Sequence, residues 1–167
     1  MLYVKLVAML LSVSAAFAIV PALAQQAPPP PPPYGAPISL EQAKKAMAGA
    51  EAEARKNNWN VVIAVVDSGG HLVMMQRLDN TQIGSIDIAQ QKATTAVHFK
   101  RPTKAFQDLI AQGGANLRLL RVTNASPLEG GVPILVGGAV VGGIGVSGVT
   151  SQQDAQIAQA GADAILK

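Results

Sequence analysis

Hydrophobic residues near the end of the chain form two short runs on either side of a Gly137-Gly138 pair. The first run covers 132–136 and the second covers 139–147. A Gly-Gly pair between apolar runs is typical of a two-residue β-hairpin turn, because both glycines can adopt positive φ angles without a Cβ clash. The pattern therefore predicts a hairpin made of these two runs.

The second run alternates between two faces, and glycine is unevenly divided between them. One face carries Val140, Gly142, Ile144 and Val146, and the other carries Val141, Gly143, Gly145 and Ser147. Glycine weakens a strand, so a strand rich in it usually lets another group approach its backbone closely. That group is either a helix of the same fold or a flat ligand. Helix packing is the preferred interpretation, because every sheet must cover its apolar face.

Patterns earlier and later in the chain predict helices and further strands. Ser39 and Gln42 fit a capping box, and Leu40, Ala43, Met47, Ala50 and Ala54 follow at helical spacing up to about Asn57. The other predicted elements are a buried strand at 61–66, a turn at 67–70, a returning strand at 71–78, a helix at 85–99, a helix at 104–112 capped by Thr103, and a last helix capped by Thr150 or Ser151. The segment 116–122 fits either a strand or a helical turn, and a short strand or extended segment is the preferred interpretation. Strand pairs joined by tight turns and flanked by helices predict an α+β domain with an antiparallel sheet.

The first 37 residues have the pattern of an export signal followed by a spacer. Lys5, an apolar run at 6–20 and the small-residue site at 22–24 are typical of a cleaved signal peptide. The alternative is a retained membrane anchor, but a spanning helix needs about 20 apolar residues. We assign 1–24 to a signal peptide, 25–37, with its six consecutive prolines, to a linker, and 38–167 to the domain. We therefore expect a periplasmic or secreted protein with no membrane insertion after signal cleavage.

Composition narrows the possible chemistry. The chain has no cysteine, which excludes disulfides, thiolate metal sites and thiolate haem ligands. Its 13 basic residues include no run of five or six, so we expect no nucleic-acid partner. The sequence contains neither a nucleophile elbow nor a hydrolytic metal motif, so it identifies no catalytic residue and leaves enzymatic activity open.

Four motifs resemble those of the GlcG/HbpS-like family. They are VVDSGGH at 65–71, KATTA at 92–96, LEGGVPI at 128–134 and VGGIGVSG at 141–148. They occur in the family's order, and the resemblance covers the chain from about Ile38 to Lys167. It implies a profilin-like, PAS-related fold with a five-stranded antiparallel sheet flanked by helices. It also implies homo-oligomers, haem as the cofactor of several members, and links to haem degradation or redox sensing.

The chain departs from the family pattern at one metal site. Some exported members carry a Glu-x-x-Glu pair that binds iron on the helix before the KATTA motif. The corresponding residues here are Asp87 and Gln90, so one carboxylate is missing and the resemblance leaves that iron site in doubt. One haem-binding branch has a threonine ligand in the segment leading to the Gly-Gly-x-Pro motif, and Thr123 is its nearest counterpart.

Seven residues are candidates for contacts with haem: Asp67, His71, Lys92, His98, Thr123, Gly130 and Gly131. Imidazole is a common haem ligand and proton acceptor. The alternatives are an exposed strand-start residue for His71, a partner of the helix dipole for His98, and a turn former for Asp67. Lys92, Arg77, Lys100 and Arg101 are expected to be solvated cations that could meet haem propionates, and Met74 or Met75 could supply a thioether.

Three functional hypotheses follow. The first is an exported, homo-oligomeric haem-binding protein whose ligand lies against the glycine-rich face or between subunits. The second is a PAS-like sensory or structural module that binds another small molecule or passes information to a membrane sensor. The third is a haem-degrading enzyme in which the bound cofactor supplies the chemistry.

Overall fold

The computed structural model describes residues 29–166, so the predicted signal peptide and the start of the predicted linker lie outside the described residues. Residues Pro31–Lys167 form one compact unit. Its elements are α1 (Leu40–Lys56), β1 (Val62–Asp67), β2 (Leu72–Arg77), α2 (Ser85–His98), α3 (Lys104–Ala111), the 3₁₀ helix η1 (Gly114–Arg121), β3 (Gly131–Val136), β4 (Ala139–Ser147) and α4 (Ser151–Ala164). None of the helices in this described part is long and apolar enough to cross a membrane.

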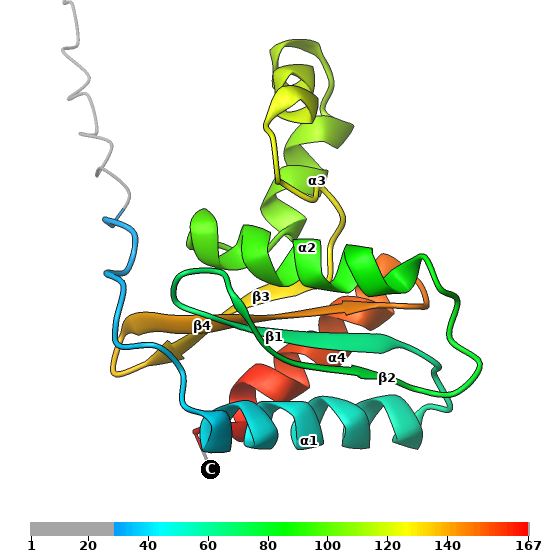
Figure 1. Cartoon of the computed structure of the whole chain (residues 1–167). Helices are drawn as coiled ribbons and strands as arrows, with labels where there is room; N and C mark the ends of the chain where they lie inside the picture. Colours follow the sequence, from blue (N-terminus) through cyan, green and yellow to red (C-terminus); the bar gives the residue numbers. More distant parts are fainter. Residues whose placement is uncertain (1–28, 167) are drawn as a thin grey trace, which may run out of the picture. The chain divides into compact units, whose positions relative to one another are not determined.

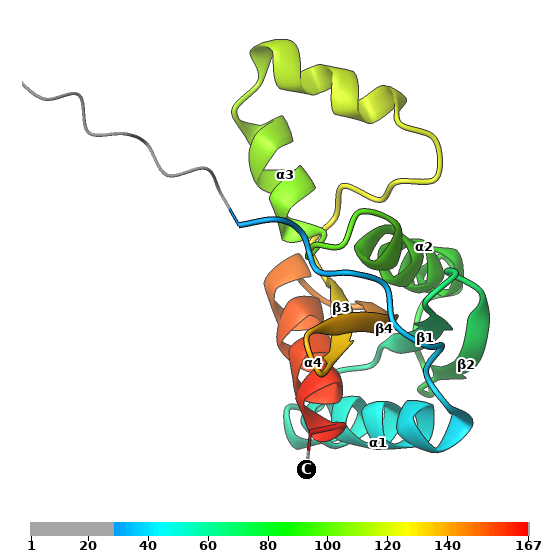
Figure 2. The same cartoon turned by 90° about the vertical axis from the view of Figure 1, so that its left-hand side faces the viewer.

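The strands form one antiparallel sheet in the order β2-β1-β4-β3. Helix α2 covers one face of the sheet, and α1 and α4 cover the other (Figures 1 and 2). The predicted α+β class and the antiparallel sheet are confirmed. The predicted count of five strands is wrong for the described chain, which has four. Tyr34 makes only an isolated bridge to Val140 of β4 instead of a further strand.

Short-range signals place most of the helices and strands. Ser39 forms the predicted capping box at the start of α1, and Thr150, one of the two predicted caps, starts α4 with a capping box of its own. Strand β1 is buried along 62–66, as its continuous apolar run predicts. Leu40 was expected on the core face of α1 but is 53% exposed. It is the first residue of the helix, and the buried stripe begins one turn later, at Ala43.

The β3–β4 hairpin turns at the predicted glycines, with φ angles of 58° at Gly137 and 81° at Gly138. A β-bulge follows, because the register shifts between Ile134 and Leu135. As a result Val140 packs with α2, whereas Val141 joins the core beneath α1 and α4. The predicted alternation is therefore wrong for these two valines, since an extra residue in a bulge reverses the faces beyond it.

Helices α3 and η1 form an arm that stands over α2 (Figures 1 and 2). The short strand preferred for 116–122 is wrong, because this segment is mostly the helix η1, which agrees with the alternative of a helical turn. No β-strand of the described residues pairs with the segment. Thr103 does not cap α3 with its side chain; its Oγ1 instead accepts a hydrogen bond from the backbone N–H of Gly131 at 2.9 Å.

Candidate functional site

The inner face of α2 is made of alanine and packs directly on the glycines of β4. Ala89 and Ala93 are fully buried. A Cβ added at Gly145 would overlap the Ala89 carbonyl oxygen, and one at Gly143 would lie 2.7 Å from that of Ala93. This confirms helix packing as the reason for the glycines. It also corrects the first hypothesis, because α2 already occupies the face on which the flat ligand was placed.

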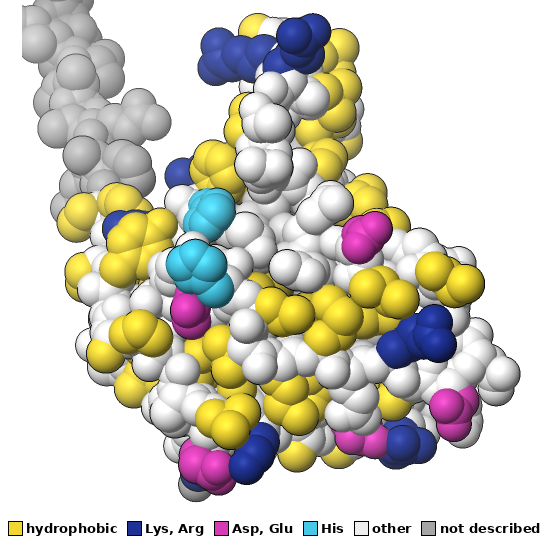
Figure 3. All heavy atoms as spheres, in the orientation of Figure 1, with side chains coloured by type: hydrophobic (Ala, Val, Ile, Leu, Met, Phe, Trp, Pro, Cys, Tyr) yellow, Lys and Arg dark blue, Asp and Glu magenta, His cyan; other side chains and the backbone are white. Residues whose placement is uncertain are grey.

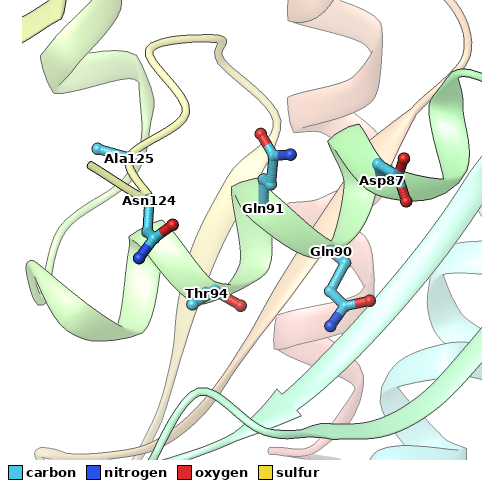
Figure 4. Close-up of a pocket in the computed structure, with 6 residues that line it drawn as sticks. All are labelled: Asp87, Gln90, Gln91, Thr94, Asn124 and Ala125. Atoms are coloured by element: carbon cyan, nitrogen blue, oxygen red, sulfur yellow. The ribbon is translucent and has the colours of Figure 1, made fainter. Parts of the chain in front are cut away.

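The outer face of α2 is polar and forms one wall of a pocket of about 490 Å³. The lining residues are Asp87, Gln90, Gln91 and Thr94 from α2, and Asn124 and Ala125 from the chain returning from the arm (Figure 4). The four α2 residues lie on one helical face because they are three, four and seven positions apart. The volume is in the range of small-molecule sites, but five of the six lining side chains are polar, whereas such sites are mostly apolar.

Thr95 holds the two walls of this pocket together. Its side chain is buried, and its Oγ1 accepts a hydrogen bond from the backbone N–H of Ser126 at 2.8 Å. The same hydroxyl donates to the Gln91 carbonyl oxygen at 2.7 Å. Because Ser126 directly follows Ala125, these bonds fix the loop wall against α2. Sequence reasoning missed this role, since the partner of Thr95 lies 31 residues further along the chain.

His98 is the last residue of α2, and the side chains of the chain's two histidines (cyan) are neighbours in the view of Figure 3. The turn at 67–71 rests on the helix there. The Nε2 atom of His98 lies 3.3 Å from the Gly69 carbonyl oxygen, and the Thr94 hydroxyl donates to the Gly70 carbonyl oxygen at 3.3 Å. Thr94 also lines the pocket, so the turn that carries His71 contacts a pocket residue, although neither histidine is itself a lining residue. The structure thus brings together Asp67, His71 and His98 from the predicted set.

Asp67 shapes this turn and orients His71. Its Oδ1 accepts hydrogen bonds from the backbone N–H groups of Gly69 at 2.8 Å and His71 at 2.9 Å, and lies 3.4 Å from Nδ1 of His71. Partial burial raises the pKa of Asp67, but these hydrogen bonds and the His71 ring together lower it below its ordinary value. A carboxylate beside Nδ1 favours the proton on that nitrogen and leaves Nε2 as a free acceptor. The His71 side chain is 84% exposed, so this nitrogen is accessible.

Lys92 is buried, contrary to its expected place among the solvated cations. Its side chain is 2% exposed, and its Nζ donates to Asp154 Oδ2 at 2.8 Å and to the Val146 carbonyl oxygen at 2.9 Å. Burial lowers the pKa of Lys92 despite the opposing effects of Asp154 and Glu129, and burial raises the pKa of Asp154 despite the opposing effect of Lys92. Both contacts of the ammonium group lie inside the domain, where they join α2 to β4 and α4.

The remaining predicted residues lie away from the histidines. Gly130 packs against the ion pair, since a Cβ there would lie 2.8 Å from Lys92 Nζ. Gly130 and Gly131 line a separate cavity of about 320 Å³ together with Lys104. Thr123 is exposed and directly precedes the loop wall of the pocket. The seven candidates therefore divide between the histidine turn, the buried ion pair with its glycines, and the loop after the arm.

The structure offers little for a metal ion held by protein groups alone. Among residues 29–166 there is no group of three or more His, Asp or Glu side chains that could hold a metal. Asp87 and Gln90 both line the pocket, but with a single carboxylate between them. Met74 packs against the main core and Met75 against the α2 side of the sheet, so both methionines have packing roles.

Comparison with known proteins gives consistent matches over the domain. The model of a family described as "Haem degrading protein HbpS-like" matches residues 38–163. The chain is 40% identical over 110 residues to Protein GlcG of Escherichia coli (strain K12), which covers 66% of this chain and 81% of GlcG. A double glutamate-to-aspartate variant of Streptomyces reticuli HbpS superposes with a TM-score of 0.71 at 33% identity, over 91% of this chain and 97% of that one. The crystal structure of a PduOC–haem complex superposes with a TM-score of 0.70 at 28% identity, over 77% of this chain and 94% of that one.

Proposed function

Because the chain belongs to the family of HbpS-like haem degrading proteins, we propose that it binds haem beside the pocket on the outer face of α2. The observation that carries this proposal is the packing of the turn that carries His71 against Thr94 of the pocket and against His98 at the end of α2. A solved relative, PduOC, is a complex with haem. Imidazole, a neighbouring carboxylate and nearby cations are the groups that haem iron and its propionates require.

Of the two histidines, His71 is the axial ligand. Its Nδ1 faces Asp67, which leaves Nε2 free, and its ring is exposed. A metal-bound histidine usually donates its other ring N–H to a carboxylate or carbonyl, which sets the tautomer and ring orientation. His98 has a different role, because its Nε2 already contacts the Gly69 carbonyl oxygen. Lys100 and Arg101 follow directly after α2 and are the cations closest in sequence to the pair for the propionates.

A second copy of the chain would complete this site. The pocket is polar and His71 is exposed, so one subunit would leave much of a flat apolar ligand in water. Exposed apolar side chains suited to covering it exist on the arm, where Leu117 is 48% and Leu120 is 60% exposed. We therefore propose a homo-oligomer, which the mass of the purified protein from light scattering, with and without haemin, would test.

A haemin titration followed by absorbance tests the proposal. The protein is residues 25–167, compared with His71→Ala, His98→Ala and the control Lys45→Ala, which changes an exposed residue of α1. We expect saturable binding and a Soret shift, at least tenfold weaker binding for His71→Ala, a smaller loss for His98→Ala, and no change for the control. Binding no tighter than that of an unrelated protein would refute haem binding. Unchanged binding by His71→Ala would refute the ligand assignment alone.

The polar lining favours a second candidate function, the binding of a small polar molecule in the same pocket. Three carboxamide side chains line it, and each can both donate and accept hydrogen bonds. A haemin titration without saturation, together with the appearance of a bound metabolite in mass spectrometry of the native protein, would select this function. Gln91→Ala should then release the metabolite, whereas Lys45→Ala should retain it.

We also propose that the protein is exported. The predicted signal peptide at 1–24 supports a periplasmic or secreted protein, in which the proline-rich linker holds the domain away from its neighbour. A role in redox sensing with a membrane sensor partner would fit this location. Fractionation of cells that express the full chain, with the mass of the mature N-terminus measured, tests the export step. Recovery of uncleaved protein in the cytoplasm would contradict it.

A further inference from the structure

The segment 33–38 forms a strap that lies along the start of β4. The Val140 N–H donates to the Pro33 carbonyl oxygen at 2.8 Å, and the Gly35 N–H donates to the Val140 carbonyl oxygen at 2.9 Å. A third bond joins the Ile38 N–H to the Val141 carbonyl oxygen at 2.8 Å. The last residue pair between β1 and β4 is Asp67 with Gly142, so the strap uses the part of β4 beyond the end of β1.

Tyr34, in the middle of the strap, reaches the C-terminal end of α2. Its hydroxyl lies 3.0 Å from the Val97 carbonyl oxygen and 3.1 Å from the His98 carbonyl oxygen, and its single proton is shared between them in a bifurcated hydrogen bond. The Lys100 ammonium group lies 4.1 Å from the centroid of the Tyr34 ring, within the range of a cation–π contact. The strap therefore binds the end of α2 that carries His98.

The Tyr34 hydroxyl reaches a carbonyl oxygen that the last turn of α2 leaves without a backbone donor. This turn closes with Lys100 at a φ of 52° and with hydrogen bonds from Lys100 N–H to the Val97 carbonyl oxygen and from Arg101 N–H to that of Ala96. These bonds do not include the His98 carbonyl oxygen. The Tyr34 hydroxyl therefore provides a donor that the helix end does not supply for itself.

From these contacts we infer that Tyr34 is a positioning residue for the histidine pair. It holds the backbone of His98, the His98 ring contacts Gly69, and that turn carries His71. The N-terminal strap is thereby part of the haem site, and a change in the segment before the domain would alter the site without touching the ligand. This inference rests on the proposed haem binding for its functional consequence, but the positioning itself can be measured without haem.

The test compares Tyr34→Phe with the control Thr150→Ala. Tyr34→Phe removes one hydroxyl and keeps the ring, whereas Thr150→Ala removes the side-chain cap of α4. We expect the two variants to lose a similar amount of stability, because each loses one hydrogen-bonding group. In haem-free protein, the ring ¹⁵N signals of the chain's two histidines are recorded by NMR. We expect Tyr34→Phe to shift the His98 and His71 signals, and Thr150→Ala to leave them unchanged.

Haemin titration of the same variants gives the second measurement. We expect about three- to tenfold weaker binding for Tyr34→Phe, the loss of one ordinary hydrogen bond, with altered ligand bands in the absorbance spectrum. An equal loss of haemin affinity in Tyr34→Phe and Thr150→Ala would overturn the inference, because a general loss of stability would then explain both. Unchanged histidine NMR signals in Tyr34→Phe would also overturn it. If the wild-type protein does not bind haemin but the histidine signals shift, the proposed function fails while the positioning role stands.

Discussion

The buried pair of Lys92 and Asp154 allows a quantitative prediction. Asp154→Asn keeps the Oδ1 that accepts from the Val149 N–H at 3.2 Å, but removes the charge 2.8 Å from the ammonium group. Lys92→Met removes the ammonium group with little change in side-chain shape. The double variant, Lys92→Met with Asp154→Asn, removes both charges and keeps the hydrogen bond from the Val149 N–H. These three variants therefore separate the cost of an unpaired charge from the loss of neutral hydrogen bonds.

The magnitude follows from the burial of both groups, whose side chains are 2% and 3% exposed. Removing one partner of a buried ion pair destabilises a protein by about 3–5 kcal/mol, because the other charge is left without compensation. Asp154→Asn should therefore lose about that much, a large share of the roughly 5–15 kcal/mol that stabilises a typical protein. The double variant loses the hydrogen bond from Lys92 to the Val146 carbonyl oxygen, worth about 1 kcal/mol. It should be more stable than Asp154→Asn by about 2–4 kcal/mol.

Denaturant unfolding at neutral pH, followed by far-UV circular dichroism, measures these differences. A double variant no more stable than Asp154→Asn would refute the reasoning, since the unpaired charge would then not be the source of the loss. Lys92→Met adds a pH test. Burial raises the pKa of Asp154, and loss of the ammonium group raises it further, so this variant should lose stability as pH rises above about 4 through that pKa. A pH-independent stability would contradict that expectation.

Three further predictions concern other parts of the domain. Gly145→Ala should destabilise by about 1–3 kcal/mol or more in thermal unfolding, because its Cβ would overlap the α2 backbone, whereas Gly84→Ala, with open space around it, should not. Thr150→Ala should cost about 1 kcal/mol and Thr150→Ser almost nothing in the same assay, since only the first removes the cap of α4; equal losses would exclude capping as the cause. Because the fold lowers the pKa of Asp67, the ionised carboxylate stabilises the domain at pH values above 3.8, its ordinary pKa, and this stability is lost as the pH falls through the folded-state pKa. Asp67→Asn should therefore reduce the loss of stability on acidification in a series of unfolding measurements at different pH.

Features that depend on neighbouring residues in the chain could be predicted from the sequence. The capping boxes at Ser39 and Thr150, the Gly137-Gly138 turn and the buried strand β1 all rest on interactions over a few residues. The order of strand pairs, tight turns and helices extended this to the α+β class with its antiparallel sheet. The errors occur where the conformation depends on which strands pair or on a one-residue bulge in that pairing. The helix η1 replaced the preferred strand, and the bulge at Val141 reversed one end of β4.

The sequence alone also identified the histidines, Asp67 and the glycine-rich strand as important, because their chemistry is visible in the residue types. Only the tertiary structure decided what surrounds each of them. It placed α2 over the glycines, Lys92 in a buried ion pair with a residue 62 positions away, and Tyr34 on the end of α2, 64 positions away. Burial and pairing depend on which elements the folded sheet brings together, and a one-dimensional pattern does not contain these long-range contacts. The residue types were thus set by the chain, and their roles by its packing.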